Sequence, residues 1–350
     1  MEGDGIGPEV SAASVSVLNA LKPGFGVEFD FRPSPAGDLC KKRTGQALPD
    51  SSLATIEGSD VCLKAPVGET AADVIVKIRQ MLDLYANIRP SKTMPRVPSL
   101  KPAIDFVIVR ENTECLYRGM EFEFEGGVVA LRTITRKASE RIAKHAFALV
   151  EQRKHSNKVV AVHKANVLRK SDGLFAQVCR EVAVQHPSVS FSEMLVDAAA
   201  MNLIRDPESF DVIVTTNMYG DILSDEAAQL VGGLGLAPSG NIGEKFAIFE
   251  PVHGAAPDIA GKGIANPLAM ILSTSMMLDW LSSRRGDHSC AQAAAAIRSA
   301  VNSTLEMGVV TPDIGGRSTT SEVGAAVAKL LTTGAQVNIP GPRSGASSEN

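Results

Sequence analysis

The sequence lacks the segments that mark membrane, exported and nucleic-acid-binding proteins. It has no run of about 18 apolar residues and no charged stretch followed by an apolar one at its start. We therefore expect a cytoplasmic protein without a membrane partner. An excess of one charge is also missing, because 35 Lys and Arg stand against 39 Asp and Glu, for a formal net charge of −4. No basic surface for nucleic acid is expected.

Cysteine is scarce, and what there is follows no pattern. The five cysteines are scattered through 350 residues, odd in number and without C-x-x-C spacing. This arrangement excludes a disulfide framework and a zinc site and is typical of reduced intracellular thiols. A chain of this length with 44% hydrophobic residues can bury a large core. We expect it to form two domains.

The most informative stretch present is residues 215–243. A β-branched, apolar run at 210–214 predicts a buried strand before it, and residues 222–231 have helical spacing. Asp221 and Asp225 then lie one turn apart on the same helix face. Two adjacent carboxylates repel unless a cation lies between them, and such hard oxygen ligands suit Mg²⁺ or Mn²⁺. A solvated acidic helix start would give the same pattern, so the residues alone leave both interpretations open.

Three arginines and a tyrosine form a second candidate group. Arg79 and Arg89 are ten residues apart, and neither has an acidic residue four positions before it. Arg110 follows the apolar strand predicted at 104–109, and Tyr117 is seven residues further on. The planar fork of arginine binds carboxylates at two points, which favours an anionic ligand. Unrelated surface positions remain an equally good explanation of the spacing.

Two more charged residues follow predicted strands. Lys164 comes after the strand predicted at 158–162, where burial in a cleft would lower its pKa and allow it to exchange protons. Most lysines in such places are simply exposed. Asp197 follows a strand-like run at 192–196 and precedes a helix of small residues.

Two segments rich in glycine are candidates for ligand binding. The glycines of residues 3–10 (GDGIGPEV) form a tight loop before a helix predicted at 11–21, and a helix start favours anions. The loop is not the G-x-G-x-x-G dinucleotide fingerprint, and a plain turn would explain it too. The long Pro- and Gly-rich stretch at 250–263 is unlike an incidental connection. Asp258 within it could bind the ribose hydroxyls of an adenosine and would repel a 2′-phosphate.

The remaining elements are predicted from periodicity. We expect a strand at 60–64, a hairpin at 121–136, and helices at 72–84, 138–152, 198–203, 267–281 and 291–305. Residues 334–350 have the composition of a disordered tail.

Seven of these motifs together resemble one family. They are GDGIGPEV, RQMLDLYANIRP, VIVRENTECLY, HKANVLRKSDGLF, VDAAAMNL, NMYGDILSDEAA and FEPVHGAAPDIAGKGIANP. Between residue 3 and about residue 324 they occur in the order found in the β-decarboxylating dehydrogenases of the isocitrate and 3-isopropylmalate dehydrogenase type. Within that family the chain most resembles the archaeal type of 3-isopropylmalate dehydrogenase.

The resemblance implies a role for each candidate residue. It assigns binding of two malate carboxylates to Arg79, Arg89 and Arg110, proton transfer to Tyr117 and Lys164, and binding of Mg²⁺ or Mn²⁺ to Asp197, Asp221 and Asp225. The implied cofactor is NAD, with contacts from Ile6, Glu250, His253, Gly254, Ala255, Ala256, Asp258, Ile259 and Asn266. Tyr117 would protonate the enol left by decarboxylation, and Lys164 would act at the C2 hydroxyl.

The implied fold is an α/β/α sandwich of the isopropylmalate dehydrogenase type and not a Rossmann fold. A discontinuous large cofactor domain would comprise 1–84 and 232–333, and a smaller dimer-forming domain 85–231, with 334–350 as a tail. The family implies a homodimer or a higher homo-oligomer whose sites are shared, with Lys164 and Asp197 coming from the partner subunit.

The chain departs from the family pattern at both ends. The family has an apolar strand directly before GDGIGPEV, whereas only Met1 and Glu2 precede it here. Either the start is assigned too late or one strand is absent, and we expect the former. The tail has no counterpart in the family, and we expect it to be dispensable.

The turn before Arg79 is expected to face the C3 substituent of the substrate. Ile75 and Val76 stand four and three positions before that arginine. Burying an isopropyl group there gains about 1.5–3 kcal/mol, whereas an unpaired carboxylate costs more, which favours 3-isopropylmalate. Lys77 and Asp73 keep homoisocitrate and isocitrate open as alternatives, because a mobile lysine could meet a third carboxylate.

Two further expectations come from the resemblance. Asp258 and Ile259 occupy the place of a Lys-Tyr pair in NADP-dependent relatives, which favours NAD. A catalytically silent regulatory subunit is a hypothesis of another class. Such subunits lose metal or arginine ligands, and all of these are present here.

Overall fold

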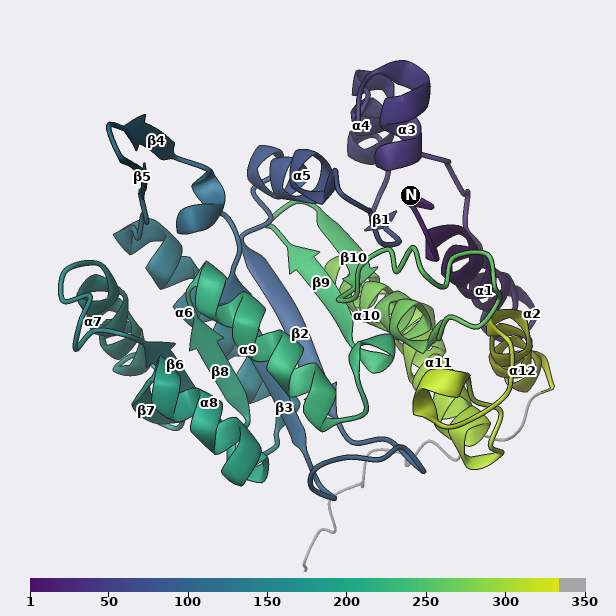
Figure 1. The fold of residues 1–350 in the computed structure, drawn as a ribbon. Helices are drawn as coiled ribbons and strands as arrows, with labels where there is room; N and C mark the ends of the chain where they lie inside the picture. The colour runs from purple at the N-terminus through teal and green to yellow at the C-terminus, as the bar shows by residue number, and fades with distance from the viewer. Residues whose placement is uncertain (334–350) are drawn as a thin grey trace, which may run out of the picture.

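One large sheet runs through the whole molecule in the computed structural model (Figure 1), which describes residues 1–333. Its eight strands have the order β1-β10-β9-β2-β3-β8-β6-β7. The pairs β10-β9, β9-β2 and β2-β3 are antiparallel, and the other pairs in this sheet are parallel. The α/β fold class expected from the sequence is confirmed. The tail expected at 334–350 lies outside the described residues.

The strands of this sheet are β1 (Cys62–Leu63), β2 (Ala86–Lys92), β3 (Asp105–Glu111), β6 (Lys158–His163), β7 (Ser190–Leu195), β8 (Val212–Thr215), β9 (Pro238–Ile242) and β10 (Ala247–Pro251). A separate hairpin consists of β4 (Glu121–Phe124) and β5 (Gly127–Ala130), within the range predicted for it.

Helices cover both faces of the half of the sheet formed by β2, β3, β8, β6 and β7. The helices α8 (Val196–Arg205) and α9 (Asn217–Leu230) pack on one face, and α6 (Arg136–Arg153) and α7 (Ser171–Ala183) pack on the other. The strands β3, β6 and β8 read as continuous β-branched runs because both of their faces are buried.

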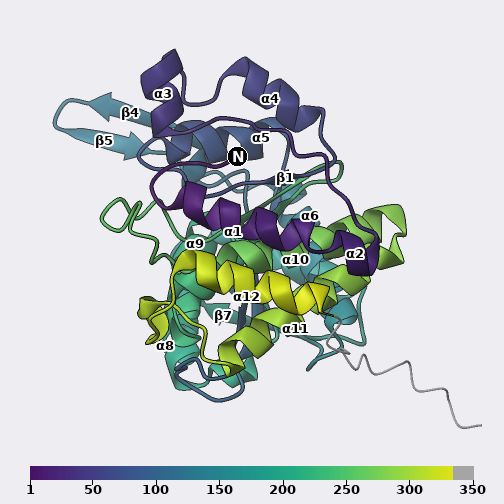
Figure 2. The same cartoon turned by 90° about the vertical axis from the view of Figure 1, so that its right-hand side faces the viewer.

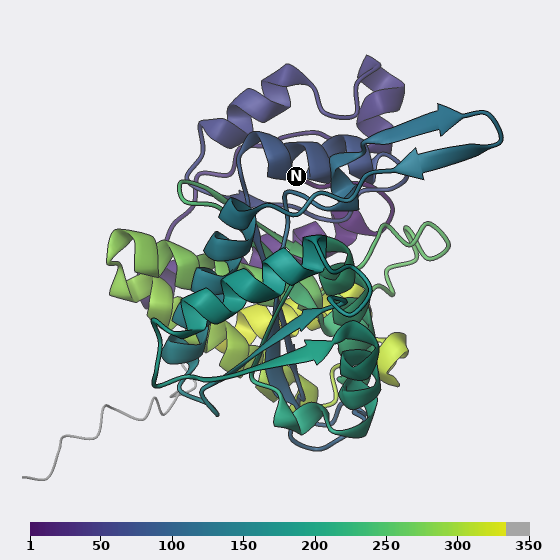
Figure 3. The same ribbon diagram turned by 90° about the vertical axis from the view of Figure 1, so that its left-hand side faces the viewer.

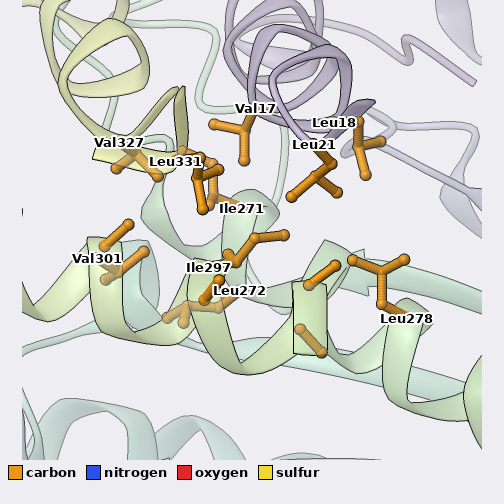
Figure 4. Close-up of a cluster of buried hydrophobic side chains, with 14 of the residues drawn as sticks. Val17, Leu18, Leu21, Ile271, Leu272, Leu278, Ile297, Val301, Val327 and Leu331 are labelled. Atoms are coloured by element: carbon orange, nitrogen blue, oxygen red, sulfur yellow. The ribbon is translucent and has the colours of Figure 1, made fainter. Parts of the chain in front are cut away.

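A second group of helices packs against β9 and β10. It comprises α1 (Gly7–Asn19), α10 (Leu268–Arg285), α11 (His288–Glu306) and α12 (Thr320–Thr332) (Figure 2). Val17, Ile271, Ile297 and Val327 point into their common core, where each is at most 1% exposed (Figure 4). This apolar core fixes the ends of β9 and β10 from which the candidate site is built.

Shorter helices complete the chain: α2 (Lys22–Phe25), α3 (Asp38–Thr44), α4 (Asp50–Glu57), a π-helical turn η1 (Ala72–Val76) and α5 (Lys77–Met81). Single 3₁₀ turns occur at η2 (Leu116–Arg118), η3 (Pro207–Ser209), η4 (Leu234–Leu236) and η5 (Pro312–Ile314).

The predicted helices differ in their bounds from those observed, and two of the differences have a structural meaning. The first helix was expected at 11–21 but begins at Gly7, because the proline of GDGIGPEV lies in its first turn, where no intrahelical donor is needed. The helix expected at 72–84 is a π-helical turn followed by α5, and it ends at Met81. A π-helical turn is wider than an α-turn and often occurs at functional sites.

Met1 lies beside β1 at the edge of the sheet. Its amino group donates to the Leu63 carbonyl at 2.9 Å, and the Ala65 amide donates to the Met1 carbonyl at 2.9 Å. The expectation about the start of the chain stays a prediction.

The hydrophobic clusters support the division into two domains, which stays a prediction. The clusters under α6 and α7 and under α8 and α9 contain buried residues of 86–231 only. The three other clusters consist of residues from 6–84 and 236–331, with Val97 as their one buried member from the middle of the chain.

Among residues 1–333, no helix is long and apolar enough to span a membrane.

Candidate active site

The candidate site lies on the sheet face that α9 covers. Asn87 of β2 is in register with Asn241 of β9 on one side and with Arg110 of β3 on the other. Partners in register point to the same face, and Arg89, two residues after Asn87, points there too. Glu250 of β10 is two residues beyond the register partner of Asn241 and shares this face. Strand alternation thus collects residues far apart in sequence.

Arg110 is held by α9 and by Tyr117. Its Nε and Nη2 donate to Asn217 Oδ1 at 2.9 and 2.7 Å, and its Nη1 pairs with Asp221. The guanidinium carbon lies 4.9 Å from the centre of the Tyr117 ring. The residue is only 1% exposed, so its charge faces the interior of the site.

Arg89 contacts the same helix one turn further on. Its Nη1 lies 2.6 Å from Ser224 Oγ and 3.2 Å from Asp225 Oδ1, and its Nη2 lies 3.3 Å from Asp221 Oδ1. The i, i+4 aspartates expected from the sequence therefore do lie side by side, facing two of the predicted arginines.

Arg79 approaches from α5. Its Nη2 donates to Glu250 Oε1 at 3.0 Å, and Lys64 pairs with the other Glu250 oxygen at 2.5 Å. Glu250 is buried, yet the two cations hold its pKa down at about 2. Arg79 Nε is buried and has no hydrogen-bond partner within residues 1–333. This N–H can therefore donate to a bound ligand, and the charge of the guanidinium group favours an anion.

The three arginines crowd one another. Burial lowers the pKa of Arg89, and burial together with the neighbouring Arg89 lowers the pKa of Arg110 to about 9. Arg79 adds to both shifts, so all three lie within Coulombic reach. Such a cluster stays protonated at neutral pH and is suited to a dianion with two carboxylates.

Asp221 joins the arginines to Tyr117, whose phenol donates to its carboxylate. Burial works to raise the pKa of Asp221, but Arg110 and Arg89 outweigh it and keep the carboxyl ionised. Burial raises the pKa of Asp225, because Arg89 compensates less there. Burial also raises the pKa of Tyr117, and its hydrogen bond to Asp221 adds to the shift. Tyr117 is therefore a phenol and a possible proton donor at neutral pH.

Within residues 1–333, Lys164 and Asp197 form no hydrogen bond or ion pair with this cluster through their side chains, and they pair with each other at 2.8 Å. Asp197 lies in the first turn of α8, and its side chain is 62% exposed. Across the described part of the chain, no three His, Cys, Asp or Glu side chains gather as a metal site requires. Asp221 and Asp225 fit a divalent cation by their hard oxygen donors, but only with ligands from outside this chain.

Seven of the nine predicted cofactor residues lie in the loop between β10 and α10, whereas Ile6 precedes α1 and Glu250 lies in β10. Gly5, with φ 58°, lets the opening loop meet that loop, since a side-chain carbon there would lie 1.9 Å from Ala255 O. Ile6 donates to that same oxygen at 2.9 Å. Burial lowers the pKa of His253, and its Nε2 is buried without a partner in residues 1–333.

The outer part of this loop is open. Space around Gly254 is free within 4 Å, and Asp258 is exposed. Asn266 is buried and donates to Asp313 at 3.0 Å. The polar atom on His253 and the open backbone at Gly254 fit a dinucleotide laid along the loop.

The structure distinguishes the two residues in the turn before Arg79 that were expected to face the substrate. Ile75 is 8% exposed and packs in the apolar cluster with Leu48, Ile56 and Ile248. Val76 is only partly buried. Of the two residues, Val76 is the one with surface left for a ligand.

Sequence reasoning missed Lys64, Asn87, Asn217 and Asn241, all of which contact the charged groups of the site. The one signal for Lys64 in the sequence is its position in the strand-like run at 60–64, because a lysine is unusual in a buried strand.

Comparison with known proteins gives consistent matches over nearly the whole chain. Residues 1–327 match the family described as isocitrate/isopropylmalate dehydrogenase. The 3-isopropylmalate dehydrogenase of Methanothermobacter thermautotrophicus is 52% identical over 329 residues, which cover 94% of this chain and 96% of that protein. The isocitrate/homoisocitrate dehydrogenase of Thermus thermophilus is 47% identical, over 95% of this chain and 97% of that protein.

A solved structure is similar as well. The crystal structure of isocitrate dehydrogenase from Methylococcus capsulatus superposes with a TM-score of 0.88 at 40% identity, covering 95% of this chain and 98% of the other.

Proposed function

The chain belongs to the isocitrate/isopropylmalate dehydrogenase family, and from this premise we propose that it oxidises and decarboxylates 3-isopropylmalate to 2-oxo-4-methylpentanoate, a step of leucine biosynthesis. Membership makes the protein an oxidatively decarboxylating dehydrogenase. The substrate, NAD as the cofactor and Mg²⁺ or Mn²⁺ as the metal are the parts that we propose.

One observation carries the proposal: three buried arginines converge beside two aspartates and a tyrosine. Arg79 Nε is a buried donor without a partner in residues 1–333, and the carboxylates that pair with the two other guanidinium groups are ones that a metal would need. A malate brings the two carboxylates that these arginines require. It also brings the C2 oxygen that a cation at Asp221 would polarise.

Each side chain of the site then has a distinct task. Arg79, Arg89 and Arg110 hold and orient the two carboxylates, which fixes the C1–C2–C3 unit between the sheet and α9. Tyr117 gives its phenolic proton to C3 after the carboxylate on that carbon has left. Lys164 of the partner subunit takes the proton of the C2 hydroxyl.

The two absent groups would supply the remaining chemistry. The loop between β10 and α10 would hold NAD, which would supply the acceptor for the hydride from C2. Asp221 and Asp225, with Asp197 of the partner subunit, would hold a divalent cation, which would supply Lewis-acid polarisation.

We propose that the site is completed in a homodimer. The helices α8 and α9, which carry Asp197 and Asp221, expose large apolar side chains: Met201 is 69% exposed, Ile204 57% and Ile222 57%. The hairpin β4-β5 projects from the body (Figure 3) and exposes Phe122 and Phe124 by 57% and 59%. A second copy would bury these surfaces and bring a carboxylate to the incomplete metal site.

The choice among malates depends on the turn before Arg79. Val76 presents an apolar surface there, which favours an isopropyl substituent at C3. Homoisocitrate and isocitrate remain the second candidates, because Lys77 and Asp73 on the same turn are exposed charges. The name of the Thermus relative supports this alternative.

The deciding experiment is NADH production by the purified protein with Mg²⁺ or Mn²⁺. It compares kcat/KM for 3-isopropylmalate, homoisocitrate, isocitrate and D-malate. We expect 3-isopropylmalate to lead by about a hundredfold, equivalent to about 2.7 kcal/mol. A lead for a tricarboxylate would refute the substrate assignment. Absence of turnover by the protein alone would favour a silent regulatory subunit.

A further inference from the structure

A chain of buried hydrogen bonds joins two of the substrate arginines across the sheet. Arg89 Nε donates to Asn87 Oδ1 at 2.6 Å, and Asn87 Nδ2 donates to Asn241 Oδ1 at 2.9 Å. Asn241 Nδ2 in turn donates to Glu250 Oε1 at 2.8 Å, the oxygen that accepts from Arg79 at 3.0 Å. We call Asn87 and Asn241 the amide bridge.

The amide bridge is fully desolvated. Asn87 and Asn241 are both 0% exposed, while Arg89 and Glu250 are 7% and 6% exposed. Hydrogen bonds in such surroundings have no water to replace a lost partner, so each donor and acceptor fixes its neighbour. The amide of Asn241 accepts from Asn87 through its oxygen and donates to the carboxylate of Glu250 through its nitrogen.

The bridge crosses the sheet where the two proposed domains meet. Asn87 of β2 and Asn241 of β9 are partners in register, and each lies shortly after one of the proposed boundaries at 84/85 and 231/232. The arginine of α5 and the arginine of β2 are thus joined by a side-chain connection as well as by the backbone of residues 80–88.

We propose that Asn87 and Asn241 are positioning residues that hold Arg79 and Arg89 at the spacing that two substrate carboxylates require; this inference rests on the proposed function. Neither asparagine needs to touch the substrate. If the bridge is lost, the backbone of both arginines stays where it is, but their guanidinium groups can move independently. The affinity for a dicarboxylate then falls.

The protein contains its own control. Asn112 Nδ2 donates to the same oxygen, Asn241 Oδ1, at 3.0 Å, and also to the Leu84 carbonyl. Asn112 is buried like the bridge residues, at 3% exposed, but within residues 1–333 its side chain forms no hydrogen bond with an arginine. A change at Asn112 removes the same kind of hydrogen bond without breaking the connection.

The test compares wild type with Asn87→Ser, Asn241→Ser and Asn112→Ser in the full chain. We expect KM for 3-isopropylmalate to rise about tenfold or more in the first two variants, with KM for NAD unchanged, and to stay within about twofold in Asn112→Ser. The double variant Asn87→Ser/Asn241→Ser should be no worse than the single ones, because both break one connection. Circular dichroism and thermal unfolding confirm that each protein is folded.

Two results would overturn the inference. One is an unchanged KM for 3-isopropylmalate in a folded Asn87→Ser or Asn241→Ser protein. The other is an equal rise in Asn112→Ser, which would indicate general loosening of the sheet. If wild type turns over none of the malates, the proposed function fails separately. Titration calorimetry then measures the affinity of wild type and of the three single variants for 3-isopropylmalate. Equal affinities in all four proteins would contradict the inference.

Discussion

The phenol of Tyr117 donates a hydrogen bond to one oxygen of Asp221, and Arg110 pairs with the other oxygen. One carboxylate therefore touches a residue proposed to bind substrate and a residue proposed to donate a proton, and is itself proposed to bind metal. Its substitution should affect all three tasks.

Asp221→Asn should lower kcat/KM for 3-isopropylmalate by about 10²–10³, because an amide cannot balance the charge of a divalent cation. Titration calorimetry with Mn²⁺ should show weaker binding as well. Glu226→Gln is the matched control, since Glu226 lies on the same helix but contacts none of the three arginines in residues 1–333. Unchanged Mn²⁺ affinity in Asp221→Asn would contradict the assignment.

Tyr117→Phe should lower kcat by about 10²–10⁴ while changing KM little. Phenylalanine keeps the ring near Arg110, 4.9 Å from its guanidinium carbon, and removes only the proton donor. The raised pKa of Tyr117 also means that wild-type activity should not fall through ionisation of this phenol below about pH 10. Steady-state kinetics from pH 6 to 10 measure both effects. A proportional rise in KM would instead indicate a role in binding.

Asp221 and Lys64 show which parts of the site could be predicted from the sequence and which could not. The helix that carries Asp221 and Asp225 was predictable, because an i, i+4 pair depends only on local periodicity. Lys64 meets Glu250 across 186 positions, a contact that no local pattern reports. The asparagines of the amide bridge were missed for the same reason, since strand order places them together and a single sequence does not give that order.

The assignment of Lys164 and Asp197 illustrates a different limit. Both were placed in the site by family resemblance, and within the described residues they pair with each other, whereas Arg110 pairs with Asp221. The role proposed for them depends on a second copy of the chain, whose position the sequence of one chain does not give.

Glu114→Gln should change how stability depends on pH. Burial raises the pKa of Glu114 to about 7, and Glu111 adds to the shift, from the usual value of 4.5. The folded state then binds more protons than the unfolded state between these values, so this carboxyl makes the protein less stable as pH rises through that range. Glutamine keeps an oxygen to accept from the Thr135 amide. Urea denaturation at pH 5 and pH 8 measures the free energy of unfolding of both proteins. The value for the variant should rise relative to that of wild type at pH 8. An equal change in both proteins between the two pH values would contradict this prediction.

Asp258→Lys should improve the use of NADP relative to NAD. The side chain of Asp258 is exposed on the loop proposed to bind the cofactor, where a carboxylate repels a 2′-phosphate and an ammonium group attracts it. The ratio of kcat/KM for the two cofactors measures the change. Glu306→Lys makes the same change of charge at the exposed end of α11 and should leave the ratio as it is. An unaltered ratio in Asp258→Lys would show that this residue does not face the ribose.

Val76→Arg should shift preference from 3-isopropylmalate toward homoisocitrate. Val76 ends the π-helical turn three positions before Arg79 and is partly exposed, whereas Ile75 is committed to the apolar core. A guanidinium group at Val76 would pair with the third carboxylate of homoisocitrate and would leave an isopropyl group against a charge.

Met81→Arg is the control for this change, because it adds the same group to the end of α5 at a side chain that is 49% exposed. We expect the ratio of kcat/KM for the two substrates to move by about tenfold or more in Val76→Arg and to stay constant in Met81→Arg. If selectivity is unaltered in both, the turn does not face C3, and the exposed Lys77 becomes the residue to test for recognition of the substituent.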